Sequence, residues 1–200
     1  AKGLFHAHVR VRGAGIVLRI PRLSSFGFSP AENLTYQAAC FARAAASGHV
    51  PALIGTIAPQ PGIPWGALII SEIDGGTPPV PSGLAAIARA LAAIHVVPVP
   101  SPTDRPPVPS HDDPVAATLE VIEAQARFLP DAGLDAGALA QIHDELDGAR
   151  AFALSASGAD IPVTLVGTDT HPGNFMMRPD GVAIFVDLEK MLYGAPTIDL

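Results

Sequence analysis

Hydrophobic and polar residues alternate at the start of the chain. Apolar residues occupy the odd positions from 5 to 11, and His or Arg occupies the even positions. A period of two is typical of a strand with one buried face. Glycines at 13 and 15 predict a turn, and the apolar run over residues 16–20 predicts a second strand that ends at Pro21. The first twenty residues therefore predict a hairpin.

A helix and two more strands are predicted next. Ser29 followed by Pro30 has the pattern of a helix N-cap and first helical position, and Gly48 ends the apolar periodicity, so we expect a helix over residues 30–47. Its Cys40 lies among Ala and Phe residues, which indicates a buried, inert thiol. Residues 52–58 and 67–70 predict two strands joined by a turn rich in Pro and Gly.

The middle of the chain is helical. Apolar residues recur at helical spacing over residues 82–95, 115–128 and 135–155. A Pro-rich loop over residues 96–114 ends in His111-Asp112-Asp113, which we interpret as helix-capping charge rather than a metal site. The last helix is predicted to turn one apolar face inward, formed by Leu139, Ile142, Leu146, Ala149 and Phe152.

The most informative stretch follows these helices. Residues 163–166 predict a short buried strand, and residues 168–173 a loop broken by Pro and Gly. Two short strands, 175–177 and 182–186, flank the turn sequence Arg-Pro-Asp-Gly. Such a hairpin would bring Asp187 back beside Asn174, with the loop presenting Asp169 near both.

These three side chains suit phosphoryl transfer. The reaction needs a group that accepts or orients the acceptor hydroxyl's proton, and hard oxygen ligands for the Mg2+ that accompanies the nucleotide phosphates. In this scheme Asp169 is the base, and Asn174 and Asp187 hold the Mg2+. A lone Asp-x4-Asn is common in turns, so the inference depends on the hairpin and on the third carboxylate.

The same stretch resembles a known family. Residues 167–174 read Gly-Thr-Asp-Thr-His-Pro-Gly-Asn, residues 186–189 Val-Asp-Leu-Glu, and residues 194–200 Gly-Ala-Pro-Thr-Ile-Asp-Leu. In order and spacing they are similar to three motifs of the aminoglycoside phosphotransferase/choline kinase-like family, and the first two also resemble the catalytic loop and metal-binding Asp of protein kinases. The family has His-Gly where this chain has Gly167-Thr168. That His ties the loop together, so its replacement bears on loop rigidity rather than on the chemistry.

The resemblance implies an α+β, two-lobe protein kinase-like fold. We expect a small antiparallel-sheet lobe over residues 1–73 and a mainly helical lobe over residues 74–200, with ATP between them. It implies that Arg19 contacts the nucleotide phosphates, the alternative being a solvated strand arginine. It places backbone groups of Glu72 and Ile73 at the adenine edge. His95 is expected to be structural.

The resemblance also implies an acidic partner for this arginine on the helix over residues 30–47. The family's Glu falls nearest Gln37, and Glu32 lies about one and a half turns earlier. Gln37 can hydrogen-bond a guanidinium without a charge–charge attraction. The sequence leaves the choice between the two residues open.

Composition narrows the setting. The 200 residues are 48% hydrophobic and carry a formal net charge of −7, which argues against a nucleic-acid surface and permits cationic small substrates. A single cysteine excludes an internal disulfide framework and a Cys-rich zinc site, and fits a reducing, cytoplasmic setting. No apolar run reaches membrane-spanning length, so we expect no membrane partner.

The predicted function is an ATP- and Mg2+-dependent phosphotransferase with a small-molecule hydroxyl acceptor. Two alternatives stay open: a catalytically inactive kinase-like nucleotide-binding module, and a metal hydrolase built on Asp169, His171 and Asp187. Such hydrolases usually have more His ligands. The chain has no initiator Met and stops right after Asp199-Leu200, so we expect a fragment truncated at both ends. The sequence leaves open both the acceptor and the oligomeric state.

Overall fold

The computed structural model of the chain describes residues 5–156, 158 and 160–200. It divides into two compact units. The larger unit comprises Ala1–Ser110 with Thr164–Leu200, and the hairpin unit comprises His111–Val163. No helix in the described part of the chain combines the length and the apolarity needed to cross a membrane.

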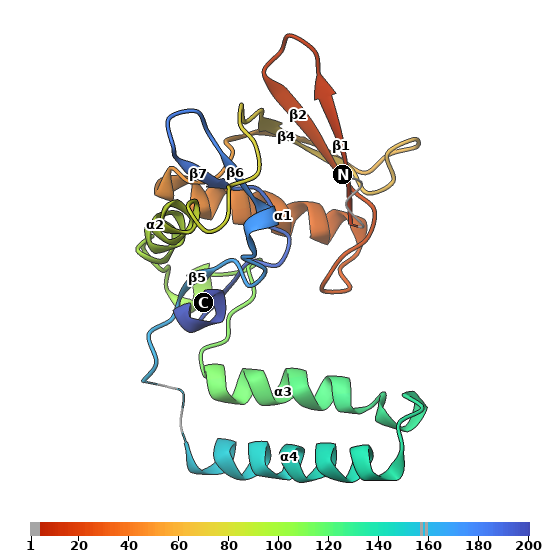
Figure 1. Ribbon diagram of the computed structural model, residues 1–200. Coiled ribbons are helices and arrows are strands. Elements are labelled where there is room, and N and C mark those ends of the chain that lie inside the picture. Colours follow the sequence, from red (N-terminus) through yellow and green to blue (C-terminus); the bar gives the residue numbers. More distant parts are fainter. Residues whose placement is uncertain (1–4, 157, 159) are drawn as a thin grey trace. The chain divides into compact units, whose positions relative to one another are not determined.

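Four antiparallel strands form the sheet of the larger unit, in the order β1-β2-β4-β3 (Figure 1). Their bounds match the strands predicted from the sequence: β1 His6–Val11, β2 Ile16–Pro21, β3 Leu53–Ile57 and β4 Ala67–Ser71. The turn between β1 and β2 has left-handed glycines at Gly13 and Gly15. That conformation explains the glycines there, because other residues rarely adopt it.

The buried face of β1 differs from the alternation expected from the sequence. His6 is 4% exposed, whereas Val9 is 46% exposed. The expected burial of the apolar side is therefore wrong at these two positions. The reason is chemical: His6 has three polar partners inside the unit, described below, and these satisfy its ring nitrogens.

Helix α1, Pro30–Ala44, begins with the predicted N-cap. The Ser29 side chain accepts from the Glu32 N–H and the Glu32 carboxylate accepts from the Ser29 N–H, which is a capping box. A short 3-10 turn over Ala45–Ser47 follows, and Gly48 ends it in the left-handed conformation. Burial raises the pKa of the Cys40 thiol to about 12, which confirms the inert thiol.

The rest of the larger unit is built from α2, Leu84–His95, and two small antiparallel pairs. The strand pair β6 and β7, Phe175–Met177 and Ala183–Phe185, is the predicted hairpin. The pair of β5 and β8, Thr164–Val166 and Leu192–Gly194, includes a strand that the sequence analysis missed. Helix α2 packs against β5 and β7.

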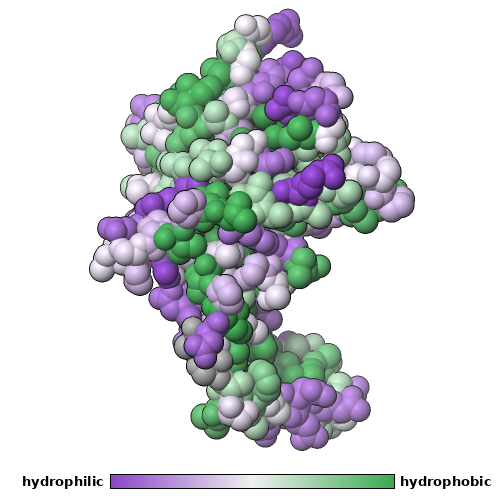
Figure 2. Space-filling model, turned by 90° about the vertical axis from the view of Figure 1, so that its left-hand side faces the viewer, coloured by the Kyte–Doolittle hydropathy of each residue, from purple (hydrophilic) through white to green (hydrophobic). Residues whose placement is uncertain are grey.

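The hairpin unit contains two helices that lie side by side in Figure 1, α3 Pro114–Ala126 and α4 Ala136–Ser155. Asp113 and Asp135 cap their N-termini, as expected for the charged loop before α3. The predicted inward face of α4 is only partly confirmed: Leu146 is buried, but Phe152 is 61% exposed. One neighbouring helix covers one side of α4, so part of its apolar surface remains at the surface, as do other apolar side chains shown in green in Figure 2.

Candidate active site

The β6–β7 hairpin brings Asn174, which precedes β6, close to Asp187, which follows β7. Phe175 and Phe185 are opposite each other in the ladder. One residue further out, the Val186 N–H donates to the Asn174 carbonyl at 2.9 Å. Asp187 is the next residue along. The juxtaposition predicted from the Arg-Pro-Asp-Gly turn is therefore confirmed.

His49 attaches this hairpin to the segment between α1 and β3. Its carbonyl accepts from the Phe185 N–H at 2.8 Å, and its Nδ1 lies 2.8 Å from the Ala183 carbonyl. Since both bonds go to β7, the strand that leads to Asp187 is held at two points. No motif or spacing in the sequence marks His49 for this role.

Asp199 holds the loop that precedes Asp169. Its fully buried carboxylate accepts from the Gly167 N–H at 2.9 Å and from the Thr168 N–H at 2.7 Å. His95 Nε2 lies 2.8 Å from the same carboxylate, which confirms His95 as a structural residue. The closing Ile-Asp-Leu motif thus fixes the loop at the two positions where the sequence departs from the family pattern.

Thr168 occupies a backbone conformation that favours glycine. Its φ is 63°, in the left-handed region where a β-branched residue is strained. The side chain supplies a compensating contact, because Thr168 Oγ1 donates to the Lys190 carbonyl at 3.0 Å. The loop therefore holds a left-handed residue at Thr168 with the help of this side-chain contact.

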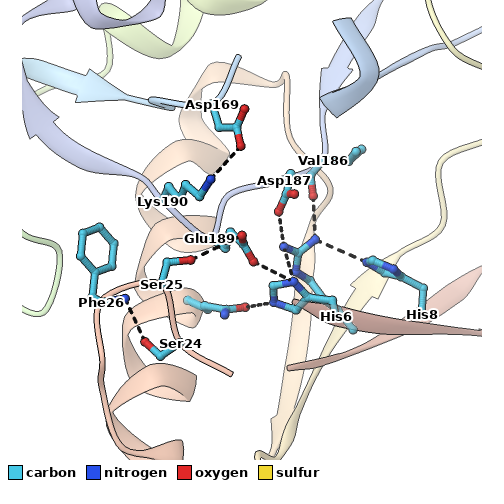
Figure 3. Close-up of polar contacts among 12 residues, drawn as sticks. His6, His8, Ser24, Ser25, Phe26, Asp169, Val186, Asp187, Glu189 and Lys190 are labelled. Atoms are coloured by element: carbon cyan, nitrogen blue, oxygen red, sulfur yellow. Dashed lines mark hydrogen bonds and ion pairs between the residues drawn. The ribbon is translucent and has the colours of Figure 1, made fainter. Parts of the chain in front are cut away.

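Asp169 is 39% exposed in its side chain and has two polar neighbours. Its Oδ2 accepts from Lys190 Nζ at 2.9 Å (Figure 3). Its Oδ1 lies 3.8 Å from His171 Nε2. Asn174 Nδ2 donates to the Asp169 backbone carbonyl at 2.8 Å, which ties the loop to the hairpin. The hydrogen bond that Lys190 donates to Asp169 raises the pKa of Lys190.

Arg19 on β2 is 2% exposed, and its side chain contacts the residues that directly follow β7. It donates to the Asp187 carboxylate and, through NH1, to the Val186 carbonyl at 3.0 Å (Figure 3). The alternative of a solvated strand arginine is therefore excluded. Burial opposes ionisation of Asp187, but Arg19, by charge and hydrogen bond, and then the two histidines of β1 lower the pKa of this carboxyl overall.

His6 contacts Arg19, the Glu189 carboxylate and the Gln37 side-chain amide. Its Nδ1 lies 2.9 Å from Glu189 and 3.2 Å from Arg19, and its Nε2 lies 3.1 Å from the Gln37 side-chain oxygen. Among the described residues, no hydrogen bond joins Arg19 directly to Glu32 or Gln37. Glu32 is used in the capping box, and Gln37 reaches Arg19 through His6.

His8 also faces the arginine, with its Nε2 3.4 Å from NH1 of Arg19. Burial, then the positive charge of Arg19 and the neighbouring His6 lower the pKa of His8 to about 4. Since its pKa is far below neutrality, His8 is uncharged at pH 7 and adds no second positive charge beside Arg19.

Two sets of groups have the chemistry of a cation site. The ligand atoms of His6, Asp187 and Glu189 lie within 4.8 Å of one another, but this set includes a His nitrogen, which is not among the oxygen ligands that Mg2+ prefers. Asp187 and Asn174 offer a carboxylate and an amide oxygen at the same edge of the nearby cleft, and hard oxygen donors are what Mg2+ prefers. The second pair therefore fits Mg2+.

That cleft has a volume of about 620 Å³. Its floor and walls come from the sheet, the segment after β4 and the β6–β7 hairpin, and its lining includes Arg19, Glu72, Ile73, Asn174 and Asp187. A volume of this size suits a nucleotide-sized ligand. Five of the predicted site residues thus share one cleft, whereas Asp169 and Gln37 lie outside its lining among the described residues.

The segment after β4, residues 72–76, is hydrogen-bonded to the β1–β2 turn at one end and to β6 at the other. The Glu72 N–H donates to the Gly15 carbonyl at 2.8 Å, and the Glu72 side chain pairs with Arg10. Gly76 and Met177 exchange two backbone hydrogen bonds, of 3.1 and 2.7 Å. Since the Glu72 N–H is used within the sheet, its carbonyl and the Ile73 backbone are the groups left for an adenine edge.

Lys190, His6 and Glu189 were not identified from the sequence as site residues. Glu189 is the last residue of the Val-Asp-Leu-Glu motif and Lys190 directly follows it, and this proximity to Asp187 was the available signal for them. His6 carried no signal, because the strand alternation placed it on the polar face.

A family model described as "Phosphotransferase enzyme family" matches residues 5–200. The comparison with curated proteins found no match. Among solved structures, the chain is similar to APH(2")-IIa in its ternary complex with streptomycin and ATP, with 14% identity and a TM-score of 0.63 over 100% of this chain and 67% of that one. The aminoglycoside phosphotransferase APH(4)-Ia gives 18% identity and a TM-score of 0.63 over 100% and 68%.

A second kind of enzyme shares the fold. Choline kinase LicA from Streptococcus pneumoniae has 12% identity and a TM-score of 0.60, covering 98% of this chain and 64% of that one. At such low identity these similarities show the fold, which is α+β and kinase-like, as predicted. The chain spans about two thirds of the length of these solved structures.

Proposed function

Because this chain belongs to the phosphotransferase enzyme family, we propose that it transfers the γ-phosphate of ATP to a hydroxyl group of a small molecule. One observation carries the proposal. Asp187 and Asn174 meet at the edge of a nucleotide-sized cleft that also contains Arg19, and the backbone of Asp169 is hydrogen-bonded to Asn174. These are the groups that phosphoryl transfer requires: a base, oxygen ligands for Mg2+ and a cation for the phosphates.

In the proposed step, the acceptor oxygen forms a bond to the γ-phosphorus while the bond from that phosphorus to the bridging oxygen breaks. The electron pair of the broken bond leaves with ADP, and the hydroxyl proton passes to the Asp169 carboxylate. Asp169 lies outside the lining of the cleft, and its backbone carbonyl accepts from the Asn174 side chain at the cleft, which supports a role toward the acceptor.

The proposed roles of most of the other site residues depend on their positions in the cleft lining. We propose that Arg19 binds the phosphates, that Asp187 is the main Mg2+ ligand and that Asn174 assists it. Bound Mg2+ would neutralise charge on the phosphate oxygens and orient them. The Glu72 carbonyl and the Ile73 backbone would hold the adenine edge, and Gln37 would orient Arg19 through His6.

The acceptor is proposed only as a class. APH(2")-IIa has been solved with streptomycin and with gentamicin, and LicA is a choline kinase. All of these compounds carry hydroxyl groups and cationic nitrogen, and a net charge of −7 on this chain would favour such a ligand. We infer a cytoplasmic enzyme from the unpaired thiol of the single cysteine and from the proposed use of ATP.

A second function is a catalytically inactive nucleotide-binding module. One observation favours it: Arg19 contacts the proposed metal ligand Asp187, and no acidic side chain of α1 is hydrogen-bonded to Arg19 among the described residues. In such a module the cleft would bind a nucleotide, and the ion pair of Arg19 with Asp187 would persist, so that Asp187 would not bind Mg2+. The intact base and both oxygen ligands favour the enzyme.

Two measurements on the full-length protein separate these functions. Calorimetry with ATP in the presence and absence of Mg2+ tests the cleft, and ADP production over a panel of aminoglycosides, choline and amino alcohols tests transfer. We expect Mg2+-dependent binding and turnover with at least one acceptor. Binding without turnover on any acceptor supports the inactive module, and no binding of Mg-ATP refutes both functions.

A further inference from the structure

We propose that Lys190 is a positioning residue, whose ammonium group holds the Asp169 carboxylate in the orientation that receives the acceptor hydroxyl. The proposal rests on the proposed function, because it assigns Asp169 as the base. Lys190 Nζ donates to Asp169 Oδ2 at 2.9 Å, and the two side chains are 37% and 39% exposed (Figure 3). The pair therefore lies where a substrate can reach it.

The geometry divides the two oxygens of the carboxylate. Oδ2 is engaged by Lys190, whereas His171 Nε2 lies 3.8 Å from Oδ1, beyond hydrogen-bond distance. A carboxylate fixed through one oxygen presents the other in a defined direction. Oδ1 is thus the oxygen available to the hydroxyl proton, which a base must approach within about 2.6–3.2 Å.

Lys190 is itself held by its neighbours. The Tyr36 hydroxyl lies 2.8 Å from the Met191 carbonyl and 3.1 Å from the Glu189 carbonyl, so its one proton is shared between them, and the Lys190 carbonyl accepts from Thr168 Oγ1. Lys190 therefore binds two successive residues of the catalytic loop, Thr168 through its carbonyl and Asp169 through its ammonium. A residue anchored on both sides in this way is a fixed reference for the base.

The charge state of Lys190 fits a donor. Its hydrogen bond to Asp169 raises the pKa of the ammonium group, so Lys190 stays protonated at neutral pH and cannot compete with Asp169 as the base. The ammonium also lies 5.9 Å from the centre of the Phe5 ring, a further favourable contact for a cation. Exposed ion pairs contribute little to folding, so the contribution is expected in catalysis.

The test is a double-mutant cycle in the full-length protein with the acceptor found by the screen. Lys190→Met should lower kcat about 10-fold or more, because misplacing a base is costly, and should leave the ATP KM within about 2-fold. Lys190→Arg keeps the charge and a donor, and should restore part of the rate. In an Asp169→Asn background, Lys190→Met should cost less than about 2-fold, because its target is gone.

Arg150→Met is the matched control, since it removes an ion-paired cation from the hairpin unit without touching the site. It should keep the wild-type kcat. The proposal is overturned if Lys190→Met retains the wild-type rate, or if its loss is equally large in the Asp169→Asn background. The latter result would mean that Lys190 acts on the phosphoryl group by itself.

A readout without turnover separates this proposal from the proposed function. The titration of Lys190 can be followed by NMR of 13C-labelled lysine, with Lys190→Met assigning the signal. The midpoint should lie above that of an ordinary lysine and fall in Asp169→Asn. An unchanged midpoint in that variant would refute the contact even in an active enzyme, whereas a wild-type protein inactive on every acceptor would refute the proposed function alone.

Discussion

Arg19 shows how the chemistry of the cleft depends on individual contacts. One guanidinium contacts Asp187, the Val186 carbonyl, His6 and His8, which its fan of five donors allows and a lysine ammonium could not reproduce. Asp187 is the one carboxylate it touches directly among the described residues. Since Arg19 and Mg2+ both need this carboxylate, we expect Mg-ATP binding to shift the guanidinium from Asp187 toward the phosphates.

The two proposed metal ligands are predicted to contribute unequally to Mg2+-dependent turnover. Asp187→Ala should abolish Mg2+-dependent turnover more completely than Asn174→Ala, because an ionised carboxylate binds Mg2+ more strongly than a neutral amide. Turnover measured across a magnesium titration checks this, with Arg150→Ala as a control at a surface ion pair. The opposite ranking would exchange the two roles.

Asp169→Asn is predicted to impair the chemical step specifically. The change keeps size and some hydrogen bonding but removes the charge that accepts the proton, so kcat should fall about 10^2-fold or more. The ATP KM should change little, because the interaction matters in the transition state. Steady-state kinetics and a thermal melt of the variant test both parts. Near wild-type kcat in a folded variant would rule out Asp169 as the base.

The sequence predicted some of the observed contacts and missed others for a clear reason. The proximity of Asn174 and Asp187 was predictable because a short hairpin joins them, and that of Asp169 to Asn174 because they share one short loop. The contacts of His6 with Glu189 and of Asp169 with Lys190 join segments that meet only through the tertiary fold. Residue type and spacing carry no information about such pairs.

At the scale of elements, a helix or strand could be predicted where residues in the sequence mark its beginning, its end or its turn. Helix α1 was predictable because a Ser-Pro start and a Gly end mark it, and the β6–β7 hairpin because of its turn. Strand β8, Leu192–Gly194, was missed, since it is three residues long and exists by pairing with β5. Thr168 shows the same limit, because its left-handed backbone depends on contacts made by Asp199 and Lys190.

Asp199→Ala is predicted to loosen the catalytic loop. It removes the acceptor of the buried Gly167 N–H and of the half-buried Thr168 N–H, and the partner of His95; an unsatisfied buried group costs about 1–3 kcal/mol. We expect the unfolding free energy to fall by about 3 kcal/mol in a urea titration, with lower activity. Asp144→Ala, at an exposed position of α4, is the control and should unfold like the wild type. Equal midpoints for both variants would contradict this role of Asp199.

At the scale of the whole chain, the order of elements predicted the kinase-like fold but not its compact units. Residues 111–163 form the hairpin unit, and the larger unit is assembled from segments on both sides of it. That assembly depends on long-range contacts, such as those of β5 with β8 and of Arg19 with Asp187, which no local pattern contains. The proposed boundary between a sheet lobe and a helical lobe near residue 73 remains a prediction.

The nucleotide is predicted to stabilise one unit selectively. Every residue that lines the cleft belongs to the larger unit, so Mg-ATP binding should slow amide hydrogen exchange in β2, β4 and the β6–β7 hairpin. At a concentration about 100 times Kd, binding contributes about 2.7 kcal/mol to the stability of the bound state. Exchange in α3 and α4 should change much less, since the hairpin unit contributes no lining residue.

Arg19→Ala provides the matched control for this exchange experiment. Loss of a charged hydrogen bond to phosphate costs about 1.5–3 kcal/mol, so the variant should bind Mg-ATP about 10-fold or more weakly. At the same nucleotide concentration, its protection of β2 and β4 should shrink accordingly. Exchange followed by mass spectrometry on the full-length protein resolves the segments. Equal protection in the wild type and in a folded Arg19→Ala variant would mean that Arg19 does not bind the phosphates, and protection confined to α3 and α4 would place the nucleotide outside the cleft.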